Sequence, residues 1–421
     1  MSLYLNIKFD NSVNSVKSIL VINGVEVPIS GRKEKWFTNL PIKSNDKIEL
    51  VGNAEHVSFE IVPHKIFHPD QVVFDKKYGI KEFIHEGGSI FYSLTGNVTN
   101  PQKCLITFPG VSNFDNVNYR LSAMTSLQSR LHNTLILAFQ DKESVYGNYM
   151  YETENGTRIK SIATKLILEL GQRYNLNPTD FIFYGNSKGA SIAIDYIDEF
   201  PDSKYFIDIP QLELFNYAPQ NPLMRYSLGE KARHYYNYLE KLPALKNKNV
   251  TYSFAENDFD ASRGMPMKSF SGMNVVMLKD MPHSGSAMEL VKRQFSKVIQ
   301  LIANRDAVSK KNIDMRFAFV NGKLFASRLL GAFKEEVMIS KVYAEIEFYN
   351  SDSSYSVSLN NKFNSMLCVY WQKGFDILKH IPVGSYRMKL HVYFDFKEFV
   401  YPLNQGVQVN ELDVTINTVQ E

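Results

Sequence analysis

The chain has 421 residues, of which 44% are hydrophobic and 22% charged, as expected for a soluble globular protein of two or three domains. Its 47 basic and 44 acidic side chains almost balance, which argues against a nucleic acid or an anionic membrane as the main partner. The two cysteines, Cys104 and Cys368, are far apart and lie in apolar runs. They argue against a disulfide framework or a cysteine metal site and predict reduced thiols.

The N-terminal segment has no basic region followed by a long apolar run, so it does not resemble a secretory signal. No apolar stretch reaches the ~18 residues that a membrane-spanning helix needs. We therefore expect a cytoplasmic protein that does not span the membrane, and we leave open a peripheral position at the membrane's inner face.

Residues 1–80 have the pattern of short β-strands. Asn23-Gly24 separates the apolar runs Lys17–Ile22 and Val25–Ile29, and this dipeptide is the strongest short signal for a β-hairpin. The pattern predicts a β-rich N-terminal module without a helix.

Residues 81–308 alternate short apolar runs with amphipathic runs of helical length, such as Arg158–Tyr174 and Ser286–Ala303. Such alternation predicts an α/β domain whose mostly parallel sheet is covered by helices on both faces. The predicted strands are Ile90–Leu94, Cys104–Phe108, Leu135–Phe139, Phe181–Tyr184, Tyr205–Ile209, Val250–Phe254 and Val275–Leu278. Residues 215–245 interrupt the alternation and are either a cap over the site or a surface insertion.

Residues 309–421 return to a β pattern, with a second hairpin signal at Asn321-Gly322. Two stretches alternate strictly, which predicts a sandwich with one buried face per sheet. Their apolar positions are Val342, Ala344, Ile346 and Phe348, then Met388, Leu390, Val392 and Phe394. The opposite stripe of the second stretch is Arg387, Lys389, His391 and Tyr393. We interpret this stripe as a solvated face, with an anionic polymer as the alternative ligand.

The candidate nucleophile lies in the run Gly185-Asn-Ser187-Lys-Gly189, between an apolar strand and a helix-forming segment. A sharp strand-to-helix turn that exposes a serine hydroxyl leaves no room for side chains at the two glycine positions. The following helix directs its N-terminus at the site, which favours developing negative charge. A serine that merely caps the helix is the alternative interpretation.

A serine nucleophile needs a base, and a base that follows a later strand suits this fold. His283 comes directly after the strand Val275–Leu278, whereas the other eight histidines lie in less suitable places. The acid that orients the histidine should follow Val250–Phe254. Asp258 is the first choice there, with Asp260 and then Glu256 as alternatives.

The oxyanion hole of such a site needs two backbone N–H groups. Lys188, the residue after the nucleophile, is the first predicted donor. The second should come from the loop after Cys104–Phe108, where we favour Val111 and keep Ser112 as the alternative. An ordinary turn at Pro109-Gly110 would explain that loop equally well.

In its Gly185–Gly189 motif and in the order of Ser187, Asp258 and His283, the segment Gly88–Asn304 resembles the α/β-hydrolase superfamily. More narrowly, the Gly-Asn-Ser-Lys-Gly turn and the Phe-Pro-Gly strand end resemble bacterial polysaccharide O-acetyltransferases and the carbohydrate-modifying hydrolases of the accessory Sec pathway. The resemblance implies Ser-His-Asp chemistry on a surface glycan or capsular polysaccharide, by an esterase or an O-acetyltransferase.

This resemblance also implies partners in polysaccharide biosynthesis or secretion. We expect no bound cofactor and no metal, with acetyl-CoA as a candidate acyl donor. The alternative function is a non-enzymatic carbohydrate-binding or assembly protein that uses the hydrolase domain as a scaffold. A peptidase is a weaker third candidate.

Overall fold

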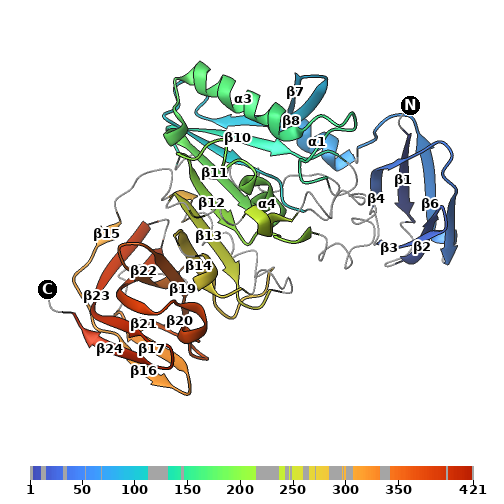
Figure 1. Ribbon diagram of the computed structural model, residues 1–421. Helices are drawn as coiled ribbons and strands as arrows, with labels where there is room; N and C mark the ends of the chain where they lie inside the picture. The colour runs from blue at the N-terminus through green and yellow to red at the C-terminus, as the bar shows by residue number, and fades with distance from the viewer. Residues whose placement is uncertain are drawn as a thin grey trace. The chain divides into compact units, whose positions relative to one another are not determined.

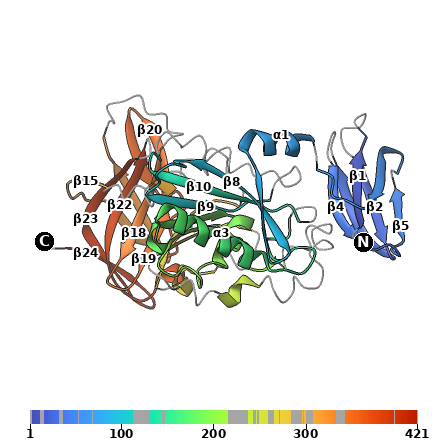
Figure 2. The ribbon, with the colours of Figure 1, turned by 90° about the horizontal axis from the view of Figure 1, so that it is seen from above.

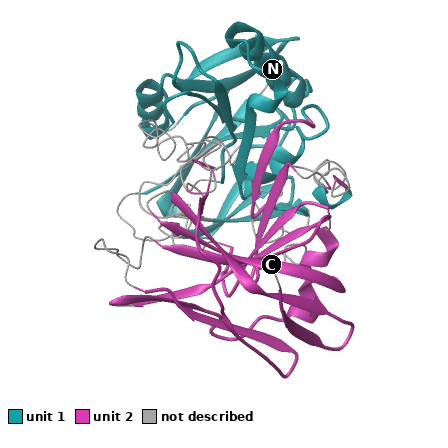
Figure 3. Ribbon diagram, turned by 90° about the vertical axis from the view of Figure 1, so that its left-hand side faces the viewer, with its two compact units in different colours: residues 1–200, 211–240 teal, residues 201–210, 241–421 magenta. Residues whose placement is uncertain are grey.

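The computed structural model describes residues 3–10, 16–31, 36–52, 54–67, 69–111, 131–143, 147–214, 237–241, 246, 249–258, 265–270, 272–283, 296, 298–299, 307–331, 342–394 and 397–419. Its residue contacts divide the chain into two compact units (Figure 3). Unit 1 comprises residues 1–200 and 211–240, and unit 2 comprises residues 201–210 and 241–421. No helix in these described ranges is long and apolar enough to cross a membrane.

Unit 1 begins with two three-stranded antiparallel sheets, drawn in blue in Figures 1 and 2. One has the order β4-β1-β6 and the other β3-β2-β5. Their bounds are β1 Leu3–Phe9, β2 Val16–Ile22, β3 Val25–Gly31, β4 Trp36–Ile42, β5 Ile48–Gly52 and β6 Val57–Val62, with the turn η1 at Ala54–His56. Asn23 and Gly24 both have positive φ, as the predicted hairpin requires. Leu5, Leu20 and Leu40 are fully buried in a shared core.

The prediction of no helix in this region is wrong, because α1 spans Pro69–Tyr78. Phe74 is buried against Ala138 together with the amide side chain of Gln71, whereas Val72 and Val73 are exposed. The helix therefore buries a polar residue and exposes apolar ones. This is why its sequence lacks the amphipathic pattern that would reveal it.

The rest of unit 1 is a five-stranded sheet with the order β7-β8-β10-β9-β11. The bounds are β7 Lys81–His85, β8 Gly88–Gly96, β9 Lys103–Thr107, β10 Thr134–Gln140 and β11 Phe181–Asn186. Strands β10, β9 and β11 are parallel, and β8 joins β10 antiparallel. Every residue of β10 is buried, as expected for a strand covered on both faces. The helices α3 (Ile159–Tyr174) and α4 (Lys188–Ile194), with the turns η3 (Pro178–Asp180) and η5 (Tyr238–Lys241), complete the elements described in this unit.

In unit 2, three parallel strands continue directly into the C-terminal strands. The order is β12-β13-β14-β19-β18-β22-β23, and β24 and β15 also pair with β23. The bounds are β12 Lys204–Asp208, β13 Val250–Ala255, β14 Asn274–Leu278, β15 Val308–Ser309, β18 Tyr343–Tyr349, β19 Ser354–Ser358, β22 Gly384–Phe394, β23 Lys397–Val409 and β24 Val414–Thr418. The junction is β14, which pairs in parallel with β19. The C-terminal strands thus extend the sheet that carries β13 and β14.

A second sheet, of order β16-β17-β21-β20, belongs to the same unit. Its strands are β16 Arg316–Val320, β17 Lys323–Leu329, β20 Asn360–Asn364 and β21 Met366–Tyr370, and the short elements η7 (Met267–Phe270) and α10 (Ile377–His380) also lie in unit 2. Phe348 of β18 packs against Trp371 and Phe375, which follow β21. Ile346 and Leu390 are fully buried on the face that the alternating pattern predicted.

The predicted fold class is therefore confirmed: an α/β core with a mostly parallel sheet is flanked by β-rich modules. The boundaries at residues 80 and 308 stay predictions. Both cysteines are free thiols, and burial raises the pKa of Cys104 to about 12.

The polar stripe of β22 is only partly a solvated face. His391 donates Nδ1 to Glu398 at 2.6 Å and Nε2 to Glu347 at 2.8 Å. Tyr393 is buried, and its single hydroxyl proton is within reach of Glu398 at 2.9 Å and of Glu345 at 3.3 Å. Burial opposes the charged imidazolium, but the two carboxylates outweigh it and raise the pKa of His391 to about 9. Burial likewise favours neutral Glu347, but its bonds to His391 and Ser354 lower its pKa to about 2.

We predict that this cluster stabilises the fold most between pH ~4.5 and ~6.5. The raised pKa of His391 means that its contribution is complete below the unfolded value of ~6.5 and is lost as the pH rises through 9. The lowered pKa of Glu347 means that its contribution is lost as the pH falls from ~4.5 through 2. His391→Gln should lower the free energy of unfolding at pH 6 by about 3–5 kcal/mol, because it removes the imidazolium that both carboxylates contact. Urea titrations at pH 6 and pH 10 measure this, and an equal loss at both pH values would contradict the assignment.

Candidate functional site

Ser187 stands at the turn between β11 and α4 in a strained backbone conformation. Its φ of 55° and ψ of −121° lie outside the regions that residues with a side chain normally adopt. Such a conformation costs about 1–3 kcal/mol and persists only where its surroundings enforce it. The carbonyl of Ser187 accepts the first hydrogen bonds of α4, from the backbone N–H groups of Ala190 and Ser191. The side chain is half-buried.

The two glycines of the motif are required by close backbone contacts. A Cβ at Gly185 would lie 2.0 Å from the carbonyl oxygen of Gly189, and a Cβ at Gly189 would lie 2.6 Å from the carbonyl oxygen of Phe108. Neither obstacle is the flexible end of a side chain, so neither can move aside. The turn therefore packs on itself and on the loop after β9, as the motif predicts.

Lys188, the residue after Ser187, is anchored by a buried ion pair that its sequence context does not predict. Lys188 Nζ lies 2.8 Å from Asp141 Oδ2, and their side chains are 2% and 0% exposed. Asp141 follows β10 and also accepts the backbone N–H groups of Asn148 and Met150. The ammonium further lies 5.6 Å from the centre of the Tyr149 ring. Two elements of unit 1, the loop after β10 and the start of α4, are thus held together by one salt bridge.

The loop around this ion pair has an unusual backbone that leaves space for it. Gly147, Tyr149 and Met150 all have positive φ. A Cβ at Gly147 would lie 2.2 Å from Asp141 Oδ2 and 2.3 Å from Lys188 Nζ. The hydroxyl of Tyr149 donates to the side chain of Gln211. In the sequence, Asp141 and Lys188 each look like an ordinary solvated charge, so the sequence pattern does not predict their pairing.

In unit 2, the structure brings His283 and Asp258 together. His283 Nδ1 lies 3.0 Å from Asp258 Oδ2, and the side chains are 14% and 0% exposed. An ionised carboxylate only accepts hydrogen bonds, so Nδ1 is the donor in this contact. The pair follows β13 and β14, which are neighbours in the sheet. This arrangement suits a general base whose tautomer is fixed by an acid.

The competing carboxylates have different positions. Glu256 accepts the backbone N–H of Asp280 at 2.8 Å and lies 3.4 Å from Lys279 Nζ, so it ties the two loops together rather than contacting the imidazole. The N–H of Asn257, bonded to the carbonyl of Met281, adds a second tie. Asp260 lies outside the described residues, and among the described ones Asp258 is the carboxylate bonded to His283. The assignment of roles stays a prediction.

The predicted oxyanion donors both lie in unit 1. Lys188 is buried at the start of α4, and Val111 is exposed at the end of the loop after β9. That loop lies close to the turn that carries Ser187. A Cβ at Gly110 would lie 3.8 Å from the carbonyl oxygen of Asn186, and the backbone N–H of Phe108 donates to the carbonyl oxygen of Tyr184. Three parts of the predictions lie outside the described residues: Ser112, residues 215–236 and 242–245 of the suggested cap, and most of the predicted helix Ser286–Ala303. Within the described part of the chain, no group of acidic, histidine or cysteine side chains could hold a metal.

Comparison with known proteins found no matching family model and no matching curated protein. Among solved structures, the chain is similar to the glycosylation-associated Gap123 complex of Streptococcus agalactiae, with 12% identity over 70% of this chain and a TM-score of 0.40. It spans 63% of that chain's length.

The chain is also similar to the capsule O-acetyltransferase of Neisseria meningitidis serogroup A, with 19% identity, 53% of this chain, 95% of the other and a TM-score of 0.36. A histidine-to-alanine mutant of that enzyme was solved in complex with CoA. An S-formylglutathione hydrolase from Agrobacterium tumefaciens has 11% identity over 53% of this chain and 94% of its own, with a TM-score of 0.38. The neighbours thus include the α/β-hydrolase and glycan-related proteins that the sequence resembles. At these scores none of them bears on the activity of this chain.

We predict that Asp141→Asn destabilises unit 1 strongly, because it leaves the ammonium of Lys188 buried without its counter-charge. The free energy of unfolding should fall by about 3–5 kcal/mol. Glu169→Gln is the matched control, since Glu169 pairs with Lys165 on the exposed face of α3 and should cost less than about 0.5 kcal/mol. Denaturant titration of both variants measures the difference, and similar losses would show that the buried pair has no special weight.

Proposed function

We propose that this protein is a serine-dependent acyl-transfer enzyme with Ser187 as nucleophile, His283 as general base and Asp258 as the orienting acid. The observation that carries the proposal is the pairing of two independent features. Unit 1 holds a serine in a strained elbow at the start of a helix, and unit 2 holds a histidine whose Nδ1 is bound by a buried aspartate. The strain at Ser187 is costly on its own, and the two features together supply the three residue types of a triad.

In the proposed reaction, Ser187 Oγ attacks the ester carbonyl while His283 Nε2 takes the hydroxyl proton. Asp258 stabilises the imidazolium that forms. The tetrahedral oxyanion accepts the backbone N–H groups of Lys188 and Val111. When the intermediate collapses, the bond to the leaving group breaks and His283 returns the proton to it. Water or a sugar hydroxyl then attacks the acyl-enzyme while His283 takes its proton. When the bond between the acyl group and Ser187 Oγ breaks, His283 gives that proton to Oγ and the free serine is restored.

We propose a surface glycan or capsular polysaccharide as substrate, in association with polysaccharide biosynthesis or secretion. The triad is common to esterases and O-acetyltransferases, which differ in whether water or a sugar hydroxyl reaches the acyl-enzyme. Acetyl-CoA is the donor to test first. The alternative, a glycan-binding scaffold without activity, is less favoured because a scaffold gains nothing from straining Ser187.

The decisive experiment is to detect an acyl-enzyme. We expect the intact protein to gain the mass of one acetyl group on Ser187 when it is mixed with an activated acetate ester. Ser187→Ala should gain no mass and should lose turnover of the ester while keeping its melting temperature. Full turnover by the alanine variant would refute the assignment of the nucleophile.

A second prediction concerns the acid. Asp258→Asn should lower kcat by roughly 10⁴-fold, because the imidazole loses the partner that fixes its tautomer. Glu256→Gln is the matched control: it alters a loop contact but leaves Asp258 on His283, so its effect should be small. Asp260→Asn should be equally mild. Steady-state kinetics with a chromogenic acetate measure all three, and a crippling effect of Asp260→Asn would transfer the role to that residue.

A further inference from the structure

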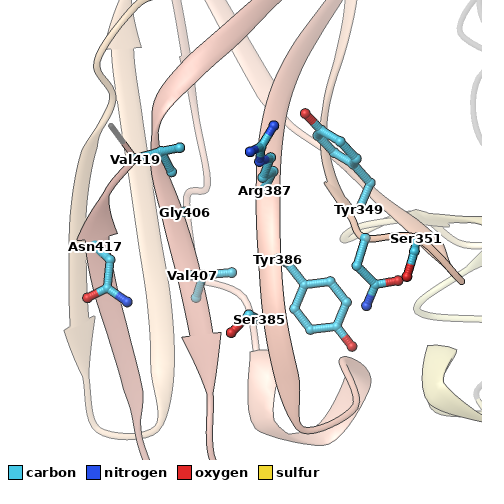
Figure 4. A pocket seen from close by; sticks show the side chains of 10 residues that line it. Tyr349, Ser351, Ser385, Tyr386, Arg387, Gly406, Val407, Asn417 and Val419 are labelled. Atoms are coloured by element: carbon cyan, nitrogen blue, oxygen red, sulfur yellow. The ribbon is translucent and has the colours of Figure 1, made fainter. Parts of the chain in front are cut away.

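The C-terminal strands of unit 2 carry a pocket of about 560 Å³ that the proposed acyl chemistry does not use. Its walls come from the end of β18, the start of β22, the C-terminal part of β23 and the end of β24 (Figure 4). The lining residues are Tyr349, Asn350, Ser351, Ser385, Tyr386, Arg387, Gly406, Val407, Asn417 and Val419. The volume suits one or two sugar rings, within the range of small-molecule sites.

One row of directly paired residues forms the floor of this pocket. Tyr349 pairs with Arg387, Arg387 with Gly406, and Gly406 with Asn417, across four neighbouring strands. Directly opposite residues share one face of a sheet, so the three side chains stand on the same face. Gly406 contributes no side chain between Arg387 and Asn417. A Cβ there would lie 3.0 Å from the carbonyl oxygen of Tyr386 and 3.1 Å from Val419, so the gap in the row is enforced by packing.

The pocket combines an aromatic ring with donors of hydrogen bonds. Tyr349 lines it, and the ammonium of Lys389 lies 4.0 Å from the centre of that ring. The side-chain oxygen of Asn350 accepts the backbone N–H groups of Asp352 and Ser353. Its side-chain NH₂ group can therefore donate hydrogen bonds to a ligand. Arg387 and Asn417 are exposed and add a guanidinium and an amide.

The charge of the pocket is positive. Among the described residues that line it, Arg387 is the charged one. The nearest carboxylate on the same face of β18, Glu347, lies opposite Lys389 and forms an ion pair with His391. In the row at the pocket, Arg387 is paired directly with Tyr349 and Gly406, and neither of these residues carries a charge. Guanidinium groups bind carboxylates and phosphates through paired hydrogen bonds.

We propose that this pocket binds an acidic saccharide, with the sugar ring against Tyr349 and its carboxylate or phosphate on Arg387. An aromatic ring presents a flat apolar surface to the C–H face of a sugar, and Asn350 and Asn417 meet its hydroxyl groups. In this proposal the pocket binds one acidic repeat unit of a glycan. That this glycan is also the acceptor rests on the function proposed above. Binding itself does not.

The test uses the full chain carrying Ser187→Ala, so that binding is measured without turnover. Calorimetry is performed with trigalacturonic acid, with a mannose 6-phosphate-terminated oligomannoside and with neutral maltotriose, and inorganic phosphate serves as the bare anion. We expect at least one of the two acidic oligosaccharides to bind roughly tenfold or more tightly than maltotriose and than phosphate. The one that binds distinguishes a carboxylate from a phosphate. If neither acidic oligosaccharide binds more tightly than maltotriose, or if phosphate alone binds as tightly, the proposal is overturned.

Two matched pairs of variants locate the binding. Arg387→Gln should weaken the affinity for the acidic oligosaccharide roughly tenfold to a hundredfold. Arg316 is an exposed arginine on β16, and Arg316→Gln should leave that affinity unchanged. Tyr349→Ala should also abolish most binding, and Tyr349→Phe should restore it because the ring is kept. Melting curves verify that each variant is folded. If Arg387→Gln and Arg316→Gln bind the acidic oligosaccharide equally well, the proposed site is overturned, whatever the role of Ser187. If Ser187 proves not to be acylated, the proposed function fails, but the binding measurements at Arg387 remain valid.

Discussion

The backbone of Ser187 is held in a conformation that the residue would not adopt by itself, and much of unit 1 is arranged to hold it there. The strain of about 1–3 kcal/mol has to be offset by contacts around the turn. Gly185 packs on the backbone of Gly189, and Gly189 packs on the carbonyl of Phe108. Because each contact is backbone on backbone, β9, β11 and the start of α4 are placed by steric exclusion rather than by adaptable side chains.

The turn at Ser187 is also held by an ion pair. Asp141 at the end of β10 holds Lys188, so the ends of three parallel strands, β9, β10 and β11, all act on one short segment. In unit 2, Asp258 and His283 likewise follow the ends of the adjacent strands β13 and β14. Ligand and catalytic groups of open α/β sheets gather at the carboxyl ends of their strands, because the connections there are free to vary while the strands stay fixed.

Local patterns were sufficient for the features that depend on neighbouring residues. The Asn-Gly hairpins, the buried run of β10 and the glycines around Ser187 can each be recognised from a few consecutive residues. The order of strands and loops predicted Asp258 and His283 as partners, and the structure places their side chains in contact, whereas their catalytic roles stay predictions. The sequence could not reveal α1, whose buried side includes Gln71 and whose exposed side includes Val73. Nor could it reveal the pairing of Lys188 with Asp141, since charged residues far apart in the chain look solvated until the fold buries them together.

The pairing of β14 with β19 changes how the C-terminal region is to be understood. β14 has four consecutive buried residues and would be an exposed edge without β19, with unpaired backbone groups along an apolar strand. The backbone N–H of Lys279, in the loop that leads to His283, is bonded to Ser358 at the end of β19. The loop of the proposed base is therefore supported by residues that a division into domains would assign elsewhere. The same sheet passes from β19 through β18 to β22, β23 and β24, which line the pocket around Arg387. Because neighbouring strands of one sheet are joined by backbone hydrogen bonds, the proposed saccharide site and the proposed base His283 would share one support, and a shared support is what orienting a polymer for reaction requires.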